Sequence, residues 1–577
     1  MWKGGFRMRL SPEAMAFIHA PDTIDFVTRA TDSFFDYVRN SNDVVVGQML
    51  SGRYVLGYTK GENFHRLAEA LGAAFVSSAS VVLGLLDRPA LDAAGVSQVQ
   101  SQPYLNLKGR GVLLGFVDTG IDYTQDVFRY EDGSSRIQYI YDQSAEGEPP
   151  AGFLLGREYS KADIDAALAS EDPYALVPER DEDGHGTFLA SVAAGRQSED
   201  FSGAAPDAEI IAVKLRKARP FYRERYCVPP DQENAYESTD VMLGVEYILR
   251  KAGELGRPVS ICIGLGTNAG SHDGYSVFEE YLSAMSIHKG VCLCAAAGNE
   301  AEARHHTAGV LNPGEKQGQV DVKVGERAGD VYLAIWNTVA DRLSVSVRSP
   351  SGELVGRVPA RPGPYPAADV KLVLEAARVQ IEYYFPMEGS GGQLSVVRIL
   401  GATPGVWTIG LHGDILLNGS YQVWLPMTGF VSPSVEFLAA TPDSTITSPA
   451  AAVGVICCGA YDSASKSLYA KSSRGPAWDG RILPDLTAPG VGVGGIYPYG
   501  PGVMSGTSAA AAVLAGTCAL MLQWGVREGN DPSMGTYQIR AYLIRGCLRR
   551  SDMTYPNNQW GYGSVQLMQS FHLMREL

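Results

Sequence analysis

Three short segments carry residues that could act together in nucleophilic catalysis. Asp118 ends the apolar run GVLLGFVD, His185 lies between two glycines in DEDGHGTFLASVAAG, and Ser508 precedes the alanines of MSGTSAAAA. A histidine, with an ordinary pKa of about 6.5, can take a serine proton and return it later, while an aspartate holds the imidazole in one tautomer. The residue types therefore predict acyl transfer by an activated serine.

The expected positions of these residues suit that chemistry. An aspartate at the carboxyl end of a strand lies where open α/β sheets bind ligands. Ser508 would begin a helix, where free N–H groups favour negative charge. Gly184 and Gly186 leave space around the imidazole of His185 for a peptide. Each residue alone has an ordinary structural explanation, such as a turn cap for Asp118, so the prediction depends on the three together.

The surrounding elements alternate between strands and helices. Near-continuous apolar runs predict buried parallel strands at 111–118, 208–215, 258–265 and 289–298. Helical periodicity follows at 238–255, and a long apolar helix is expected at 508–525. This alternation predicts an α/β fold with a parallel sheet covered by helices.

Two regions depart from this alternation and divide the chain into four parts. Residues 1–85 predict a small α+β domain, with a strand at 53–59 and a helix at 61–72. Residues 313–440 contain short strands separated by turn signals, which predict an all-β insert of the sandwich or jelly-roll type. The α/β part is thereby split into 86–312 and 441–577.

Composition excludes several classes of function. The chain has 577 residues and a formal charge of −15, which argues against a nucleic-acid partner because phosphates require clustered cations. No run of about 18 apolar residues is evident and the N-terminus lacks a signal-like apolar core, so neither a membrane span nor export is expected. The eight cysteines lie mostly in apolar runs without paired CxxC spacing, which predicts buried thiols, no structural zinc and a reducing compartment.

The order Asp, His, Ser and several further segments resemble the subtilase family. The similar segments are GAAPDAEIIAVKL at 203–215, ICIGLGTNAG at 261–270, CAAAGNE at 294–300, LTAPGVGV at 486–493 and GYGSVQL at 561–567. The resemblance implies a serine endopeptidase in which Asn299 and the Ser508 backbone N–H stabilise the oxyanion. Five more residues would flank the substrate: Leu265, Gly266, Ala295, Ala296 and Ala297.

One departure from the family concerns calcium. Relatives bind Ca²⁺ through an Asp shortly after the catalytic Asp and an Asn in the loop after the His helix. Val127 stands at the first position, and the loop at 195–203 has no Asn. Acidic residues in that loop could still supply oxygens, but we expect no obligatory calcium, no other metal and no cofactor.

The arrangement of parts is similar to the Csp-type germination proteases of clostridia, which have a prodomain and a jelly-roll insert. The resemblance implies that residues 1–85 are a prodomain, removed by autoprocessing and bound afterwards in the active-site cleft. It implies a protein substrate, a pro-enzyme of spore germination, and a cytoplasmic or spore-associated location. The cut is expected within 74–90, with Ser77, Ser78, Ala79 and Ser80 as candidates before the bond.

Two alternatives remain open at this stage. A catalytically silent relative could act as a germination sensor or scaffold, although such pseudoproteases typically lack residues of the triad, and all three are present here. A housekeeping protease without a spore role would share the chemistry and differ in substrate range, which digestion of a broad peptide library would reveal.

Overall fold

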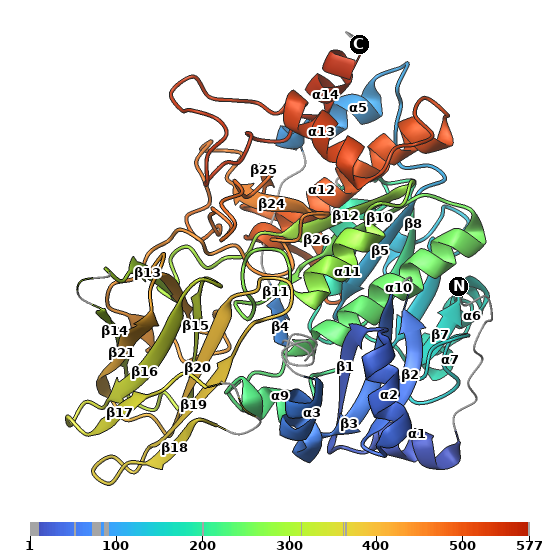
Figure 1. Cartoon of the computed structure of the whole chain (residues 1–577). Helices are drawn as coiled ribbons and strands as arrows, with labels where there is room; N and C mark the ends of the chain where they lie inside the picture. Colours follow the sequence, from blue (N-terminus) through green and yellow to red (C-terminus); the bar gives the residue numbers. More distant parts are fainter. Residues whose placement is uncertain are drawn as a thin grey trace.

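The computed structural model describes residues 11–50, 53–71, 82–85, 92–198, 201–312, 314, 316–361, 363 and 366–574. A central α/β unit carries two additions, an N-terminal unit and an all-β insert (Figure 1). Helix α9, Pro220–Arg225, lies between the two additions. Phe221 on α9 packs on Phe64 of the N-terminal unit at 5.4 Å between ring centroids, and Arg225 pairs with Glu382 of the insert at 3.5 Å.

The central sheet has eight strands, all paired in parallel except for the last pair. In spatial order they are β25 Leu486–Pro489, β24 Ile456–Tyr461, β12 Val291–Ala296, β10 Val259–Ile263, β5 Leu113–Asp118, β8 Glu209–Lys214, β6 Ile137–Asp142 and β7 Arg157–Ser160. The four strands β24, β12, β10 and β5 are buried along their whole length because helices cover both faces.

Helices α8, His185–Ala194, and α12, Thr507–Leu522, pack together on one face of the sheet. Helices α10, Ser238–Leu255, and α11, Val277–Met285, cover the other face. Residues 507–527 form the one described helical stretch that is long and apolar enough to cross a membrane, with 89% of its tested window buried. The sequence analysis expected a long apolar helix at 508–525 but did not count it as a possible span. Core helices of folded domains are buried to this extent. The expectation of no membrane span stays a prediction.

The N-terminal unit is an antiparallel sheet of order β1-β3-β2 with helices beside it. Its elements are α1 Pro12–His19, β1 Thr23–Arg29, α2 Asp32–Asn40, β2 Val44–Leu50, β3 Tyr54–Lys60, the 3₁₀ turn Gly61–Asn63 and α3 Phe64–Leu71. The sheet packs against the central α/β unit, where Tyr54 meets Tyr281 of α11 edge to face. At the same interface the buried carboxylate of Asp25 on β1 contacts Arg216 and Arg219.

The insert consists of two antiparallel sheets, β13-β22-β15-β20-β19-β18 and β17-β16-β21-β14-β23, around a common apolar core. Its strands are β13 His306–Val310, β14 Gln317–Val324, β15 Val331–Asn337, β16 Arg342–Arg348, β17 Leu354–Val358, β18 Ala368–Lys371, β19 Arg378–Tyr384, β20 Gln393–Leu400, β21 Gly405–Ile415, β22 Ser420–Trp424 and β23 Glu436–Phe437. It leaves the central sheet after β12 and returns before β24. The predicted fold class, a parallel sheet with an N-terminal α+β unit and an all-β insert, is confirmed.

The remaining elements connect or flank these parts. They are β4 Val82–Leu85, the 3₁₀ turns Asp92–Ala94 and Asp126–Phe128, α5 Val96–Ser101, α6 Lys161–Leu168, α7 Pro173–Leu176, β9 Tyr236–Glu237, β11 Leu265–Gly266, β26 Val493–Tyr497, β27 Gly500–Met504, the π-helical turn Gln523–Arg527, α13 Thr536–Gly546 and α14 Leu567–Met574.

Candidate active site

Asp118 and His185 lie together at the carboxyl end of the central sheet. Asp118 is the last residue of β5, and its Oδ1 lies 2.7 Å from Nδ1 of His185. The same oxygen accepts the backbone N–H of Thr119 at 2.8 Å. Both side chains are only 2% exposed, so the contact is shielded from water and orients the imidazole. This is the relationship that general-base catalysis requires of an aspartate and a histidine.

The loop before α8 holds His185 in place through a buried carboxylate, Asp181. Its Oδ1 accepts hydrogen bonds from the Thr119 hydroxyl at 2.7 Å and from the Gly184 N–H at 2.8 Å. Its Oδ2 accepts the N–H and the hydroxyl of Thr187, at 2.8 and 2.7 Å. Gly184 has a φ of +89°, a conformation that favours glycine. Asp181 therefore ties the end of β5 to the start of α8.

Asp181 is a residue of the candidate site that the sequence analysis missed. The segment DEDGHGT contained a signal, since an aspartate shortly before a glycine-rich helix start commonly accepts backbone N–H groups of the turn. Its hydrogen bond to Thr119, far away in the sequence, had no comparable signal.

Ser508 is the second residue of α12 and is buried. Its hydroxyl donates to the backbone oxygen of Gly264 at 2.9 Å. Gly264 also adjoins the histidine, because a Cβ built on it would lie 3.1 Å from Cε1 of His185 and 2.5 Å from Cδ1 of Leu189. Gly264 thus adjoins both Ser508 and His185, and a side chain at this position would have to displace Leu189.

Asn299 follows β12 and contacts the beginning of α12. Its Oδ1 accepts hydrogen bonds from the backbone N–H and the hydroxyl of Thr507, at 3.1 and 3.2 Å. The Thr507 hydroxyl in turn accepts the N–H of Gly298 at 3.1 Å. Since Oδ1 is committed to Thr507, the Nδ2 donor is the end of the amide that can serve a substrate oxygen beside Ser508.

Leu265 and Gly266 form β11, which pairs with β4 of the N-terminal segment. The ladder is antiparallel, with Leu265 opposite Leu85 and Gly266 opposite Gly84. On its other edge β4 pairs with β9, which completes the order β11-β4-β9. A peptide strand therefore already lies where a substrate was expected. The candidate cut residues Ser77, Ser78, Ala79 and Ser80 lie outside the described residues.

Ala295, Ala296 and Ala297 follow one another at the end of β12 and are buried. The carbonyl of Ala297 accepts the N–H of Thr447 at 2.9 Å, and its own N–H donates to Cys458 at 2.9 Å. The backbone of Ala297 is thus engaged within the protein. The three alanines were predicted to flank the substrate and its side-chain pockets, and this role stays a prediction.

A buried guanidinium contacts the two segments that the sequence analysis compared with the calcium site of relatives. Arg136 is 1% exposed, and its Nη1 donates to the carbonyl of Val127 at 3.2 Å. Its Nη2 donates to the carbonyl of Ala194, the last residue of α8, at 2.5 Å, and also to that of Ala208. Burial lowers the pKa of Arg136 to about 10, so the group is cationic at neutral pH. The carbonyls already bind the guanidinium of Arg136, and Val127 has no carboxylate. These oxygen atoms therefore do not fit a calcium site.

The cysteines are buried, as predicted for most of them, and none forms a disulfide among the described residues. Cys292, Cys294 and Cys518 have sulfur atoms within 4.8 Å of one another, between β12 and α12. A structural zinc requires four ligands, and this buried group offers three. The cluster is therefore consistent with reduced thiols packed in the core.

Residues 109–323 and 436–563 match the Subtilase family. Among solved structures, the CspB protease of Clostridium perfringens is similar over 84% of this chain and 99% of that chain, with 31% identity and a TM-score of 0.74. The resemblance noted from the sequence is confirmed.

Two curated proteins match shorter stretches. The minor extracellular protease Vpr of Bacillus subtilis (strain 168) is 34% identical over 108 residues, which are 17% of this chain and 13% of Vpr. Subtilisin-like protease 3 of Pseudogymnoascus destructans is 29% identical over 213 residues, 36% of this chain and 47% of that protein. This chain thus spans less than half the length of either one. The family match covers both halves of the central α/β unit. Together with the similarity to CspB, it shows that the chain belongs to the subtilase family of serine proteases.

Proposed function

We propose that this protein is a serine endopeptidase that cuts its own chain near β4 and then cleaves a protein pro-enzyme. The observation that carries the proposal is the Asp118–His185 pair beside Ser508, with a peptide strand paired along β11. The role in spore germination rests on the likeness to Csp-type proteases and on the CspB protease in particular.

The reaction is a two-step acyl transfer. His185 takes the proton of Ser508 as Oγ forms a bond with the peptide carbonyl carbon, and the carbonyl electrons move to its oxygen. Asn299 Nδ2 and the Ser508 N–H donate to that oxyanion. His185 then gives its proton to the leaving nitrogen as the C–N bond breaks. Water, deprotonated by His185, attacks the acyl-enzyme and releases the acid and Ser508.

The direction of β4 indicates which bond is cut first. Its register runs from Val82 opposite Glu237 to Leu85 opposite Leu265. Leu265 directly follows Gly264, whose carbonyl contacts Ser508, so the carboxyl end of β4 is the end nearer to the serine. We therefore place the first cut on the carboxyl side of Leu85, within 85–90. This position favours the later part of the 74–90 range over the candidates at Ser77–Ser80.

Autoprocessing is tested by the intact mass of the purified wild-type chain beside a Ser508→Ala variant. The wild type should appear as two fragments whose masses place the cut within 85–90, and the variant should stay whole. If both chains stay whole while circular dichroism shows them folded, the silent sensor or scaffold becomes the better explanation. A cut in both chains at the same bond would point to another protease. A second test digests a peptide library, in which a processing enzyme cuts few sequences and a housekeeping protease cuts many.

A further inference from the structure

Glu300, the residue after Asn299, is a buried carboxylate that the reaction described above does not use. Its side chain is only 1% exposed. Burial alone would raise the pKa of Glu300, but the hydrogen bond and the charge of His305 hold this pKa below its usual value of 4.5. The carboxylate is therefore ionised at neutral pH. A charge is kept in the interior only where enough hydrogen-bond donors surround it.

The donors around Glu300 come from separate segments of the chain. Its Oε2 accepts Nδ2 of Asn268 at 3.2 Å and lies 3.0 Å from Nδ1 of His305. The backbone N–H of Thr428 is shared by the two carboxylate oxygens, at 3.1 and 3.2 Å. Asn268 lies just after β11, whereas His305 precedes β13 and Thr428 follows β22 of the insert. Glu300 thus contacts the insert and the segment after β11 at once.

The insert residues that reach Glu300 lie at one end of the β13–β22 ladder. Just beyond the paired residues, the N–H of Leu425 donates to the carbonyl of His305 at 2.9 Å. We call His305 and residues 425–428 the base of the insert. The carbonyl of Leu425 also accepts Nδ2 of Asn268 at 3.2 Å. The base is therefore linked to the segment after β11 both directly and through Glu300.

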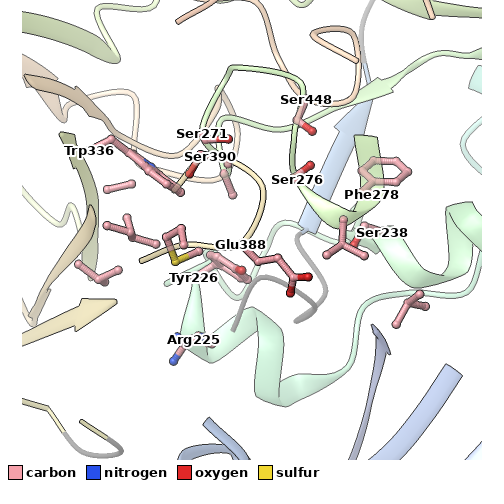
Figure 2. Close-up of a pocket in the computed structure, with 18 of the residues that line it drawn as sticks. Arg225, Tyr226, Ser238, Ser271, Ser276, Phe278, Trp336, Glu388, Ser390 and Ser448 are labelled. Carbon is pink, nitrogen blue, oxygen red and sulfur yellow. The ribbon is translucent and has the colours of Figure 1, made fainter. Parts of the chain in front are cut away.

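Farther from its base, the insert is not packed continuously against the central α/β unit. A pocket lies between them, with Trp336 of the insert on one side and Phe278 of α11 on the other (Figure 2). Its volume is about 80 Å³. Because atoms across a gap exert no contact force on each other, the contacts at the base determine the position of the insert on this side.

The backbone on both sides of Asn299 is held by one serine. Ser473 donates its N–H to the carbonyl of Gly298 at 2.8 Å, and its hydroxyl accepts the N–H of Glu300 at 3.0 Å. A displacement of the Glu300 carboxylate would pull on this short stretch of backbone. It would thereby move the amide of Asn299 relative to Ser508.

We propose that Glu300 is a positioning residue of the oxyanion site, through which the base of the insert fixes Asn299 relative to the segment after β11. With its acceptors engaged by the protein, Glu300 acts through Asn299 and not on the substrate itself. The insert thus affects the rate of the chemical step from outside the cleft. This inference rests on the proposed function, because an oxyanion site has meaning only in a protein that cleaves peptides.

The test follows autocleavage of the full chain from the uncut state. Each chain is pulse-labelled during cell-free synthesis, and the cut fraction is measured on gels over time. Four chains form a cycle: the wild type, Glu300→Gln, Asn299→Ala and the double variant. Glu300→Gln keeps the size of the side chain but places a donor against other donors. It should slow cleavage at least about tenfold in the wild type and less than about twofold in Asn299→Ala, where the group that it positions is absent.

Glu382→Gln is the matched control. Glu382 is also a buried carboxylate of the insert, but it pairs with Arg225 and Arg398 and not with the base. This variant should slow autocleavage far less than Glu300→Gln does. Equal slowing by Glu300→Gln in both backgrounds, or equal slowing by Glu382→Gln, would overturn the positioning role.

Circular dichroism of Glu300→Gln in the Ser508→Ala chain shows whether the variant folds. If it does not, the cycle is repeated with His305→Ala, which keeps the carboxylate and removes one donor. The same dependence on Asn299 is then expected, at a smaller size, and its absence would overturn the proposal. A wild type that cuts itself no faster than Glu300→Gln overturns this inference alone, whereas a wild type that never cuts itself overturns the proposed function as well.

Discussion

Gly84 lies opposite Gly266 in an antiparallel ladder, so a strand that follows the N-terminal unit is paired along the strand that leads away from the Ser508 site. The N-terminal unit is anchored separately by Asp25, which is buried between Arg216 and Arg219. The cleft is therefore occupied by β4 in the described structure. Access to the cleft therefore depends on how stably the N-terminal unit is bound to the rest of the protein.

The first prediction concerns the pH dependence of that anchor. Burial by itself would raise the pKa of Asp25, but Arg219 and Arg216 outweigh burial and hold this pKa well below its usual value of 3.8. A carboxyl whose pKa is depressed by folding stabilises the fold above about pH 4, and this contribution is lost as the pH falls further, through the folded pKa.

Asp25→Asn, made in the Ser508→Ala chain, should lower the free energy of unfolding at pH 7 by about 3–5 kcal/mol, the usual cost of breaking a buried ion pair. Its thermal unfolding is to be compared with that of Ser508→Ala alone from pH 7 to pH 2. The difference in Tm between the two chains should narrow below about pH 4. A difference that stays constant over this range would show that Asp25 does not act through its charge.

The second prediction concerns Asn299. Removal of one hydrogen-bond donor to the oxyanion typically costs about 3 kcal/mol of transition-state stabilisation. Asn299→Ala should therefore lower kcat roughly 100- to 1,000-fold with little change in KM. The measurement is peptide hydrolysis by processed enzyme, or the rate of autocleavage if that is slow enough to follow. An Asn299→Ala enzyme that loses affinity and keeps kcat would assign Asn299 to substrate binding alone.

The third prediction concerns Asp181, which acts on the site through the positions of Thr119 and Thr187. Asp181→Asn keeps the size of the side chain and replaces one acceptor oxygen by a donor, so two of the four hydrogen bonds should fail. We expect at least a tenfold loss of kcat at temperatures where circular dichroism shows the variant folded. Since His185 would be less well oriented, the pH profile of kcat should shift as well, which a general loss of stability would not cause.

The fourth prediction concerns Arg136. Arg136→Met removes three donations to carbonyls in a buried site, so in the Ser508→Ala background Tm should fall by several degrees. Arg136→Lys keeps the charge, so its Tm should lie between that of the parent chain and that of Arg136→Met. Millimolar CaCl₂ or a chelator should leave the Tm of the parent chain unchanged. A rise in that Tm with CaCl₂, saturating with concentration, would show that calcium binds after all.

Much of the site could be predicted from local sequence. Asp118, His185 and Asn299 each lie in short segments of characteristic residue types, and the strands that lead to Asp118 and Asn299 are long apolar runs. The helix at 238–255 matches α10 in both bounds for the same reason, since its buried face recurs at helical spacing.

Other features had no local signal. Arg136 binds backbone carbonyls of three separate segments, and any residue can supply a carbonyl. The hydroxyl of Ser508 donates to Gly264, a contact between residues far apart in the sequence. The pocket around Trp336 combines segments far apart in the chain. Such relations depend on how elements pack, and local residue types do not encode packing.

The position of the insert has a consequence for the order in which the protein folds. β12 and β24 are neighbours in the central sheet, yet the whole insert separates them in the chain. Bringing distant segments together costs chain entropy before any contact rewards it, and such topologies fold slowly. Three of the insert's nine strand pairs, β16–β17, β18–β19 and β19–β20, join segments close in sequence, and the pair β13–β22 brings the two ends of the insert together. Once folded, the insert would act as an internal clamp that shortens the effective loop between β12 and α12, the helix that carries Ser508.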